Sequence, residues 1–187
     1  MNVIFLDFDG TLDTFHYHSE EDIENKIKIL SDICKELDCK VVIESSAKRN
    51  IDEETLEVND EDEALNWLRK ILENFKKYGI ECIGRTPCIG RRLNKYSYTP
   101  IWKEDEIRVF LFRHPEIDHY VIIDDDDLWP RNSDLDTVRN HLVTTLYYSE
   151  NPEEEGLLEK HKEEIRKKLE LENEIKKFAE KRKSISH

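Results

Sequence analysis

The sequence predicts an α/β fold with a doubly wound, mostly parallel sheet, and three observations lead to it. Short runs of apolar and β-branched residues alternate with segments of helical periodicity along residues 1–150. Two of these runs end in paired aspartates, which is typical of strands that deliver a site to the edge of a sheet. The chain of 187 residues is 37% hydrophobic, which is enough for one core, and 39% charged, which requires solvated helices.

The first expected strand, residues 3–6, leads into Asp7-Phe8-Asp9-Gly10-Thr11-Leu12. Because side chains on a strand alternate between faces, Asp7 and Asp9 share one side, and Gly10 lets the backbone turn behind them. Two carboxylates held this close repel each other unless a cation lies between them. The segment therefore predicts a divalent metal site in which one acid keeps a proton.

Helices and strands alternate along the following residues. Ser19 and Asp22 form a capping box for a helix that extends to Leu37, and Gly79 ends a second helix that begins near Leu65. The further strands are expected at residues 40–44, 80–83, 119–123 and 142–147, and a third helix begins at residue 103.

The second expected strand, residues 40–44, delivers two hydroxyl side chains to the edge of the sheet. Ser45 and Ser46 follow the strand directly, and its register favours Ser45 as the residue that faces the site. Lys48 and Arg49 come next; they could contact a substrate, or they could be ordinary exposed basic residues.

The strand expected at residues 119–123 ends in four consecutive aspartates. Four adjacent acids repel strongly unless they are solvated or face a cation. By register we expect Asp125 to be a direct metal ligand and Asp124 to support it, whereas Asp126 and Asp127 lie at the surface.

Residues 84–103 run against the overall charge of the protein. The segment contains no acidic residue and five basic ones, interleaved with aromatic rings: Arg85, Arg91, Arg92, Lys95 and Lys103, with Tyr96, Tyr98 and Trp102. A strand of nucleic acid requires cations for its phosphates and rings on which its bases stack. A solvated loop whose aromatic side chains pack on the core explains the pattern equally well.

Residues 151–187 carry ten acidic and ten basic side chains with sparse apolar positions between them. This pattern predicts a long charged helix rather than a core helix or a coiled coil. We therefore divide the chain into a domain at residues 1–150 and a charged helical extension at residues 151–187, which contacts either the domain or a partner protein.

The net charge and the cysteines argue against several classes of protein. A formal charge of -14 argues against a protein that coats nucleic acid or binds to a membrane surface. The four cysteines have neither C-x-x-C spacing nor histidines at metal-finger spacing, so we expect reduced cysteines in a cytoplasmic protein without a zinc site. No apolar run is long enough to span a bilayer.

The string Asp7-x-Asp9-Gly10-Thr11-Leu12 at the end of an apolar strand resembles motif I of the haloacid dehalogenase (HAD) superfamily of phosphotransferases. The loop at residues 13–18 is too short for a lid domain, so the chain is similar to the capless or minimally capped members, whose open sites accept the ends of large substrates. A narrower resemblance, to the HAD domain of "Swiss army knife" RNA repair proteins, rests on residues 41–46, 86–87, 103–107, 120–125 and 156–157. It implies a Rossmann-like HAD fold.

The resemblance also implies a mechanism. Asp7 would attack phosphorus and form an aspartyl-phosphate, while Asp9, held in place by Thr11, would protonate the leaving oxygen and then activate water. Mg²⁺ would be held by Asp7, by the backbone carbonyl of Asp9 and by Asp125, with Asp124 in support.

Two further motifs of the family concern the transferring phosphoryl group. Ser45, as motif II, and Lys103, as motif III, would bind its oxygens. Ser46 is the second choice for motif II, and Arg108 and Arg92 are rivals for motif III. We also expect substrate contacts from a set of small and basic residues, which are Gly10, Ser46, Arg49, Arg85, Arg91 and Arg92.

Three hypotheses about function follow. The first is a Mg²⁺-dependent phosphomonoester hydrolase that acts on an RNA or DNA end, with residues 85–102 as its platform. The second is a phosphatase of mononucleotides or of other small phosphoesters. The third is a phosphate-dependent or metal-dependent binding or signalling module, such as a receiver-like switch that is phosphorylated on Asp7. Turnover of a generic phosphoester separates the enzymes from the switch.

Overall fold

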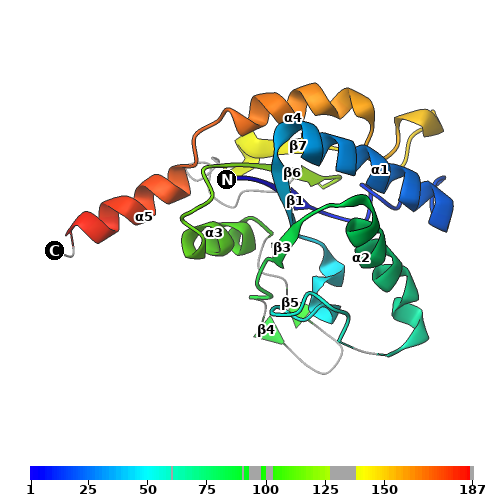
Figure 1. Ribbon diagram of the computed structural model, residues 1–187, viewed down its shortest axis with the longest axis horizontal. Helices are drawn as coiled ribbons and strands as arrows, with labels where there is room; N and C mark the ends of the chain where they lie inside the picture. The colour runs from blue at the N-terminus through cyan, green and yellow to red at the C-terminus, as the bar shows by residue number, and fades with distance from the viewer. Residues whose placement is uncertain (60, 90, 93–97, 100–102, 127–137, 186–187) are drawn as a thin grey trace.

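The computed structural model describes residues 1–59, 61–89, 91–92, 98–99, 103–126 and 138–185 (Figure 1). Five strands form one sheet in the order β3-β2-β1-β6-β7, and every neighbouring pair is parallel. The strands of this sheet are β1 (Asn2–Leu6), β2 (Cys39–Ile43), β3 (Cys82–Arg85), β6 (His119–Asp124) and β7 (Leu142–Thr144). The expected parallel sheet is confirmed, although β7 ends at Thr144 rather than at Tyr147.

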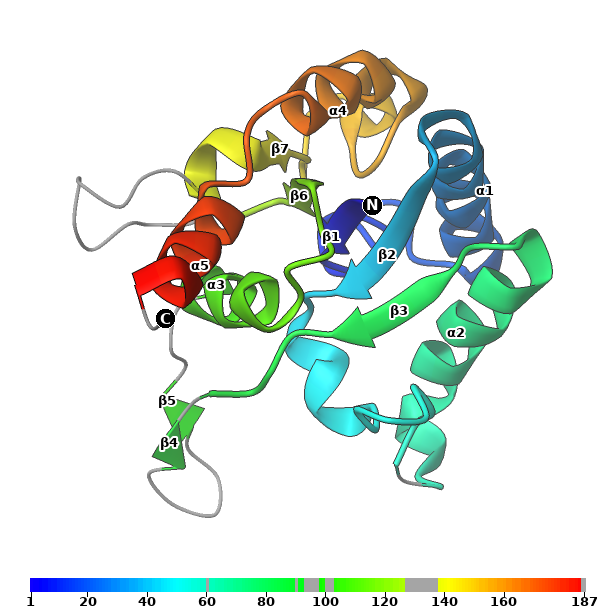
Figure 2. The same ribbon diagram turned by 60° about the vertical axis from the view of Figure 1, so that its left-hand side comes forward.

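Helices cover both faces of the sheet, which confirms the doubly wound fold (Figure 2). One face packs against α1 (Glu20–Leu37), α2 (Asn66–Tyr78) and α4 (Lys162–Leu169). The other face packs against α3 (Lys103–Arg113) and is reached by α5 (Glu174–Ile185). Alternating side chains of β1 enter the two cores, with Ile4 and Leu6 in the first and Val3 and Phe5 in the second. This is the pattern of a strand that is buried on both faces.

The predicted helix ends are present. The hydroxyl of Ser19 accepts a hydrogen bond from the backbone N–H of Asp22, and the Asp22 side chain bonds back to the backbone of Ser19. Gly79 ends α2 with a φ of 73°, a left-handed conformation that favours glycine. These local signals therefore specify where α1 begins and where α2 ends.

Residues 84–103 contain a feature that the sequence analysis did not predict. Two short antiparallel strands, β4 (Arg91–Arg92) and β5 (Tyr98–Thr99), pair with each other apart from the main sheet. Lys95, Tyr96 and Trp102 lie outside the described residues. The described residues also contain short 3₁₀ helices, which are η1 (Ser46–Asn50), η2 (Glu63–Leu65), η4 (Val138–His141), η5 (Pro152–Glu154) and η6 (Glu159–His161).

The charged C-terminal segment is helical, as expected, but it forms two helices rather than one. Ile165 and Leu169 of α4 are buried in the core on one face of the sheet, whereas Ile175 of α5 packs against the core on the other face. One straight helix cannot reach both faces, so the chain leaves the helical conformation between α4 and α5. There Asn173 donates a hydrogen bond from its side chain to the backbone carbonyl of Ile117 at 2.9 Å.

None of the helices in the described part of the chain is both apolar enough and long enough to cross a membrane.

Candidate active site

The pairing of β1 with β6 brings the two predicted acidic clusters together. Leu6 pairs with Ile123, and the backbone N–H of Asp7 donates a hydrogen bond to the carbonyl of Ile123 at 3.0 Å. Phe5 of β1 lies in the same core as α3, so by alternation Asp7, two residues further on, is directed to the α3 side of the sheet. The same alternation directs Asp124 at the end of β6 to that side.

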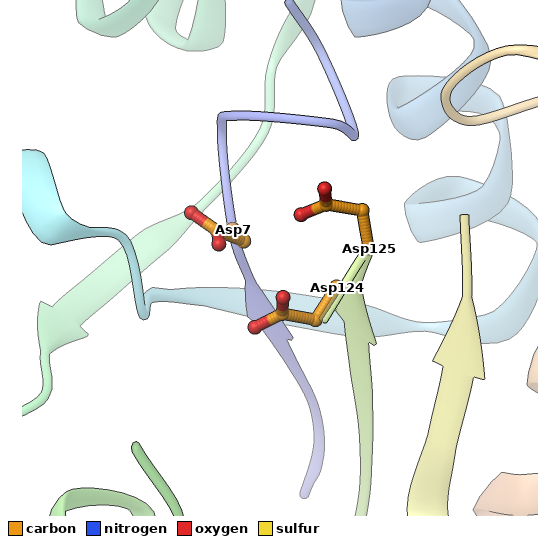
Figure 3. A group of neighbouring side chains, drawn as sticks. All are labelled: Asp7, Asp124 and Asp125. Atoms are coloured by element: carbon orange, nitrogen blue, oxygen red, sulfur yellow. The ribbon is translucent and has the colours of Figure 1, made fainter. Parts of the chain in front are cut away.

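Three carboxylates meet at this point. Oxygens of Asp7, Asp124 and Asp125 all lie within 4.8 Å of one another, and Figure 3 shows them at the ends of β1 and β6. Burial, and then the negative charge of Asp7, raise the pKa of both Asp124 and Asp125. Grouped carboxylate oxygens are the ligands that Mg²⁺ prefers, and a cation would relieve their repulsion. The three side chains therefore fit a divalent metal site.

Lys103 is the cation of this group. Its ammonium forms ion pairs with Asp7 and, at 2.8 Å, with Asp124. Burial alone would lower the pKa of Lys103, but the two carboxylates raise it above its ordinary value, so the side chain stays charged. The structure thus places Lys103, the first residue of α3, between Asp7 and Asp124, whereas its role as motif III stays a prediction. Arg108 lies further along the helix and pairs with Asp105 at 2.9 Å.

Asp9 is more exposed than Asp7 and is not part of the group of three carboxylates. Burial of part of its side chain and the charge of Asp7 raise the pKa of Asp9, whereas Lys103 and a hydrogen bond with the Ser46 side chain oppose the rise. A raised pKa favours a carboxyl group that holds a proton beside a charged neighbour. The hydrogen bond also shows that the Ser46 side chain contacts the carboxyl group of Asp9.

The turn behind the two aspartates is tightly packed. Gly10 adopts a φ of 70°, and a Cβ atom built there would lie 2.1 Å from Cγ of Asp125. Thr11 is fully buried, and its hydroxyl lies 3.1 Å from the hydroxyl of Thr145, just beyond β7. The structure therefore shows Thr11 joining the turn to the end of β7, whereas a role in holding Asp9 stays a prediction.

Ser45 is buried at the carboxyl end of β2. Its hydroxyl accepts a hydrogen bond from the backbone N–H of Ala47 at 3.3 Å and caps η1. Ser46, the second choice for motif II, is exposed and contacts Asp9. Both serines lie at the same edge of the sheet as Asp7, so the choice between them stays a prediction.

A buried polar network beside the site was not predicted from the sequence. The ammonium of Lys48 binds both carboxylate oxygens of Glu44 at 2.9 Å, the hydroxyl of Thr86 at 2.7 Å and the carboxylate of Glu106. All four side chains are nearly inaccessible to solvent. Lys48 is therefore not an exposed basic residue, because its ammonium is buried and bound by two acidic side chains and a hydroxyl.

This network, which we call the Lys48 network, joins the end of β2 and η1 to the first turn of α3. Burial raises the pKa of Glu44 to about 8, although Lys48 opposes the shift. Because Val42 faces the same core as α3, alternation also turns Glu44 toward α3, where Glu106 lies. The only local signal in the sequence was the spacing of four residues between Glu44 and Lys48, which is common in solvated helices.

The basic residues predicted to bind substrate occupy different environments. The Arg85 guanidinium donates to the backbone carbonyls of Ile51 at 2.7 Å and Thr86 at 3.2 Å. Arg49 is exposed and donates to the backbone carbonyl of Ser46 at 3.0 Å. The side chains of Arg91 and Arg92 lie outside the described part of the structure. Substrate binding by these residues stays a prediction.

A known protein family matches most of the chain. The model of a family described as "HAD domain in Swiss Army Knife RNA repair proteins" matches residues 3–161. The match extends beyond β7 to Gly156 and Leu157, whose backbone N–H groups donate to the carbonyls of Leu146 and Thr11 at 2.9 Å each. No curated protein and no solved structure matches the chain significantly.

Proposed function

Because this chain belongs to the family of HAD domains in Swiss Army Knife RNA repair proteins, we infer that it is a phosphatase-type hydrolase, and we propose that it removes a phosphate from the end of a polynucleotide. The observation that carries the proposal is the ion pairing of Lys103 with both Asp7 and Asp124, beside Asp125. A nucleophilic carboxylate, a fixed cation and two further acids at one sheet edge are what phosphoryl transfer requires.

Asp7 is the nucleophile in the proposed first step. Its Oδ1 accepts a hydrogen bond from the backbone N–H of Phe8 at 2.7 Å and its Oδ2 pairs with Lys103, so the carboxylate is oriented before substrate binds. An Asp7 oxygen forms a bond to phosphorus, and the bond between phosphorus and the leaving oxygen breaks. Asp9, whose raised pKa favours the protonated form, gives its proton to that leaving oxygen.

The second step returns the enzyme to its starting state. Asp9, now a carboxylate, takes a proton from water, and the water oxygen forms a bond to phosphorus. The bond between phosphorus and Asp7 breaks, inorganic phosphate leaves, and Asp9 again holds a proton. Lys103 stays paired with the charge that spreads over the phosphoryl oxygens.

Asp7 and Asp125 would hold Mg²⁺ together with the backbone carbonyl of Asp9, and the bound ion would reduce the repulsion between Asp7 and the phosphate anion. Asp124 already bonds to Lys103 and to the backbone N–H of Asp126, at 2.9 Å, so it supports the ligands rather than replaces them. Asp125 does not take part in the ion pair between Lys103 and Asp124, so its carboxylate can bind the metal ion. This division of roles follows the expectation from the sequence.

The choice of a polynucleotide end rests on two observations. The family description refers to RNA repair proteins. The loop between Asp13 and His18 is short, so no inserted domain stands between β1 and α1 to enclose a small substrate. An open site can accept the end of a strand as well as a small ester.

The test is phosphate release from single-stranded oligonucleotides with a 3′-phosphate or a 5′-phosphate, beside mononucleotides and p-nitrophenyl phosphate. Each substrate is tested with Mg²⁺ and with EDTA. We expect oligonucleotide turnover that requires Mg²⁺, is lost in Asp7→Asn and is retained in Asp32→Asn, a matched change at an exposed position of α1. Activity on small esters alone would contradict the polynucleotide substrate, and no activity on any ester would contradict the enzyme.

A second variant tests the covalent step. The Asp9→Asn variant can neither protonate the leaving oxygen efficiently nor activate water, but it keeps the nucleophilic carboxylate of Asp7. We therefore expect phosphorylated protein to accumulate in Asp9→Asn when the leaving group is a good one, as in p-nitrophenyl phosphate. Intact-protein mass spectrometry after acid quench measures it, and an Asp7→Asn/Asp9→Asn double variant is the control that must stay unmodified.

A further inference from the structure

Three aromatic side chains are exposed together beside the candidate active site. Phe15 is 54% exposed, Tyr147 48% and Tyr148 55%, although rings of this size are usually buried in large part. They come from two loops, one that follows Asp9 and one that follows β7. Contiguous exposed apolar surface on a folded domain marks a binding site more often than an accident of packing.

The rings form one surface. The ring of Phe15 lies edge-on to Tyr148, with centroids 5.2 Å apart, and edge-on to Tyr147 at 6.3 Å. The imidazole of His16 is stacked on Tyr148 at 5.6 Å with an interplanar angle of 30°. We call these four residues the aromatic platform.

The aromatic platform is held in place by a buried acid, Glu155. Its carboxylate accepts hydrogen bonds from the backbone N–H of His16 at 3.0 Å and from that of Ser149 at 2.9 Å, and its Oε1 lies 2.6 Å from Nδ1 of His16. Burial would raise the pKa of Glu155, but these hydrogen bonds lower it to about 2. Glu155 thus fastens the two loops together, so the rings need little ordering when a ligand binds.

The aromatic platform is directly connected to the turn at residues 9–13, which carries the proposed acid Asp9. Asp9 and Asp13 form a β-bridge, and the backbone N–H of Gly10 donates to the carbonyl of Asp13 at 2.7 Å. Phe15 is only two residues further on, at most about 7.6 Å from Asp13 between Cα atoms. The backbone N–H of Phe15 in turn donates to the carbonyl of Tyr147 at 2.9 Å.

We propose that the aromatic platform stacks the unpaired bases next to the terminal phosphate of a single-stranded RNA that the site acts on. The proposal rests on the proposed function and adds to it the place where the strand binds. Aromatic faces stack on any base, which suits an enzyme that must accept ends of different sequence. Neither loop, at residues 13–18 and 145–149, contains Lys or Arg, so stacking rather than phosphate pairing supplies the affinity.

The experiment compares Phe15→Ala, Tyr148→Ala and the double variant with wild type. The control is Phe112→Ala, which removes a ring that is 48% exposed near the far end of α3 from Lys103. Fluorescence anisotropy measures Kd for a labelled single-stranded RNA octamer. Kinetics measure KM and kcat for the same octamer with a terminal phosphate and for p-nitrophenyl phosphate.

We expect Kd and KM for the octamer to rise about tenfold in each single variant, in line with the loss of one stacked base. The kinetic constants for p-nitrophenyl phosphate should stay within twofold of wild type, and Phe112→Ala should behave as wild type throughout. Octamer Kd should depend only weakly on salt, because few phosphates are neutralised.

Three results would overturn the proposal. The first is wild-type protein that does not bind the octamer, and the second is platform variants that bind it as tightly as wild type. The third is a concentration-dependent dimer, seen by sedimentation, that Phe15→Ala abolishes, because the platform would then bind a second copy of the chain. The proposed function is tested apart from all three by p-nitrophenyl phosphate and oligonucleotide turnover of the wild type.

Discussion

Gly10 and Asp125 are packed so closely that a Cβ atom on the glycine would lie 2.1 Å from Cγ of the aspartate. The turn after β1 and the end of β6 therefore fit each other only without a side chain at position 10. Because Gly10 also has a φ of 70°, both the backbone and the space around it require glycine. The position of one carboxylate of the candidate metal site thus depends on the residue that forms the turn after β1.

Gly10→Ala should abolish phosphatase activity, because the new methyl group displaces Asp125. Gly79→Ala is the matched control: its φ is 73°, but no atom lies within 4 Å of the new Cβ. Both variants bear the strain of a left-handed alanine, about 1 kcal/mol. We expect Gly79→Ala to lose roughly this stability in urea unfolding and to keep its activity. Equal activities in the two variants would show that Asp125 tolerates displacement.

Lys103→Met should lower kcat/KM by about 10²-fold to 10³-fold, as removal of a fixed charge-stabilising group does in other enzymes. Lys103→Arg keeps the charge and should lose less. Lys70→Met, which breaks only a solvent-exposed ion pair with Glu20, is the control and should be fully active. Steady-state kinetics on p-nitrophenyl phosphate measure all three. If Lys103→Met stays within tenfold of wild type, the role of motif III passes to Arg108 or Arg92.

Lys48→Met should lower the free energy of unfolding by about 3–5 kcal/mol, because it leaves the Glu106 carboxylate buried without its cation and removes the hydrogen-bond donor that binds Glu44. Lys40→Met, which removes an exposed partner of Glu81, should cost at most about 1 kcal/mol.

A triple variant separates the charge from the packing of the Lys48 network. Adding Glu44→Gln and Glu106→Gln to Lys48→Met removes the uncompensated charge of Glu106 and makes both side chains neutral amides, which should recover much of the loss. Urea unfolding measures the series. A triple variant as unstable as Lys48→Met alone would show that the packing of Lys48, rather than its charge, stabilises this region.

Stability should fall as the pH rises from about 5 to 8 because of Glu44. Its pKa is raised from 4.5 to about 8 by burial, so the folded state binds more protons than the unfolded state between these values. Stability from this group is therefore present below the unfolded pKa and is lost toward the folded one, at up to about 1.4 kcal/mol per pH unit. Urea unfolding at pH 5.5, 7 and 8.5 should show this slope in wild type and a smaller one in Glu44→Gln. Equal slopes of stability against pH in wild type and Glu44→Gln would contradict the role of Glu44 in this pH dependence.

Local patterns in the sequence were sufficient for most of the fold. The apolar run before Asp7, the capping box at Ser19 and the glycine after α2 each depend on a few neighbouring residues, and all three were confirmed. The break between α4 and α5 depends instead on which face of the sheet each helix covers. That information lies in contacts with Ile117 and with both cores, so periodicity alone predicted one helix where there are two.

The residues of the candidate site also divide into those that local sequence patterns or motifs identified and those that only tertiary contacts revealed. Asp7 and Asp124 were identified because strand ends place chemistry at one edge of a parallel sheet, whatever the rest of the chain does. Lys103 was identified because the resemblance to the family implies a basic residue at the start of a helix. Lys48 and Phe15 carried no such signal: a lysine after a strand is usually exposed, and an aromatic residue in a loop usually packs on the core. In the folded protein the lysine is buried and the ring is exposed.

The sequence by itself determined the order of the five strands of the main sheet and of helices α1 to α3, the family and the edge at which the acids gather, because these follow from short-range periodicity and from motifs. Only the tertiary structure decided what surrounds those acids: the Lys48 network behind them and the aromatic platform beside them. Both arise from contacts between residues far apart in the chain, such as Lys48 with Glu106 and His16 with Glu155. The physical reason is that burial and exposure are set by what packs against a side chain, and not by the side chain's own neighbours in sequence.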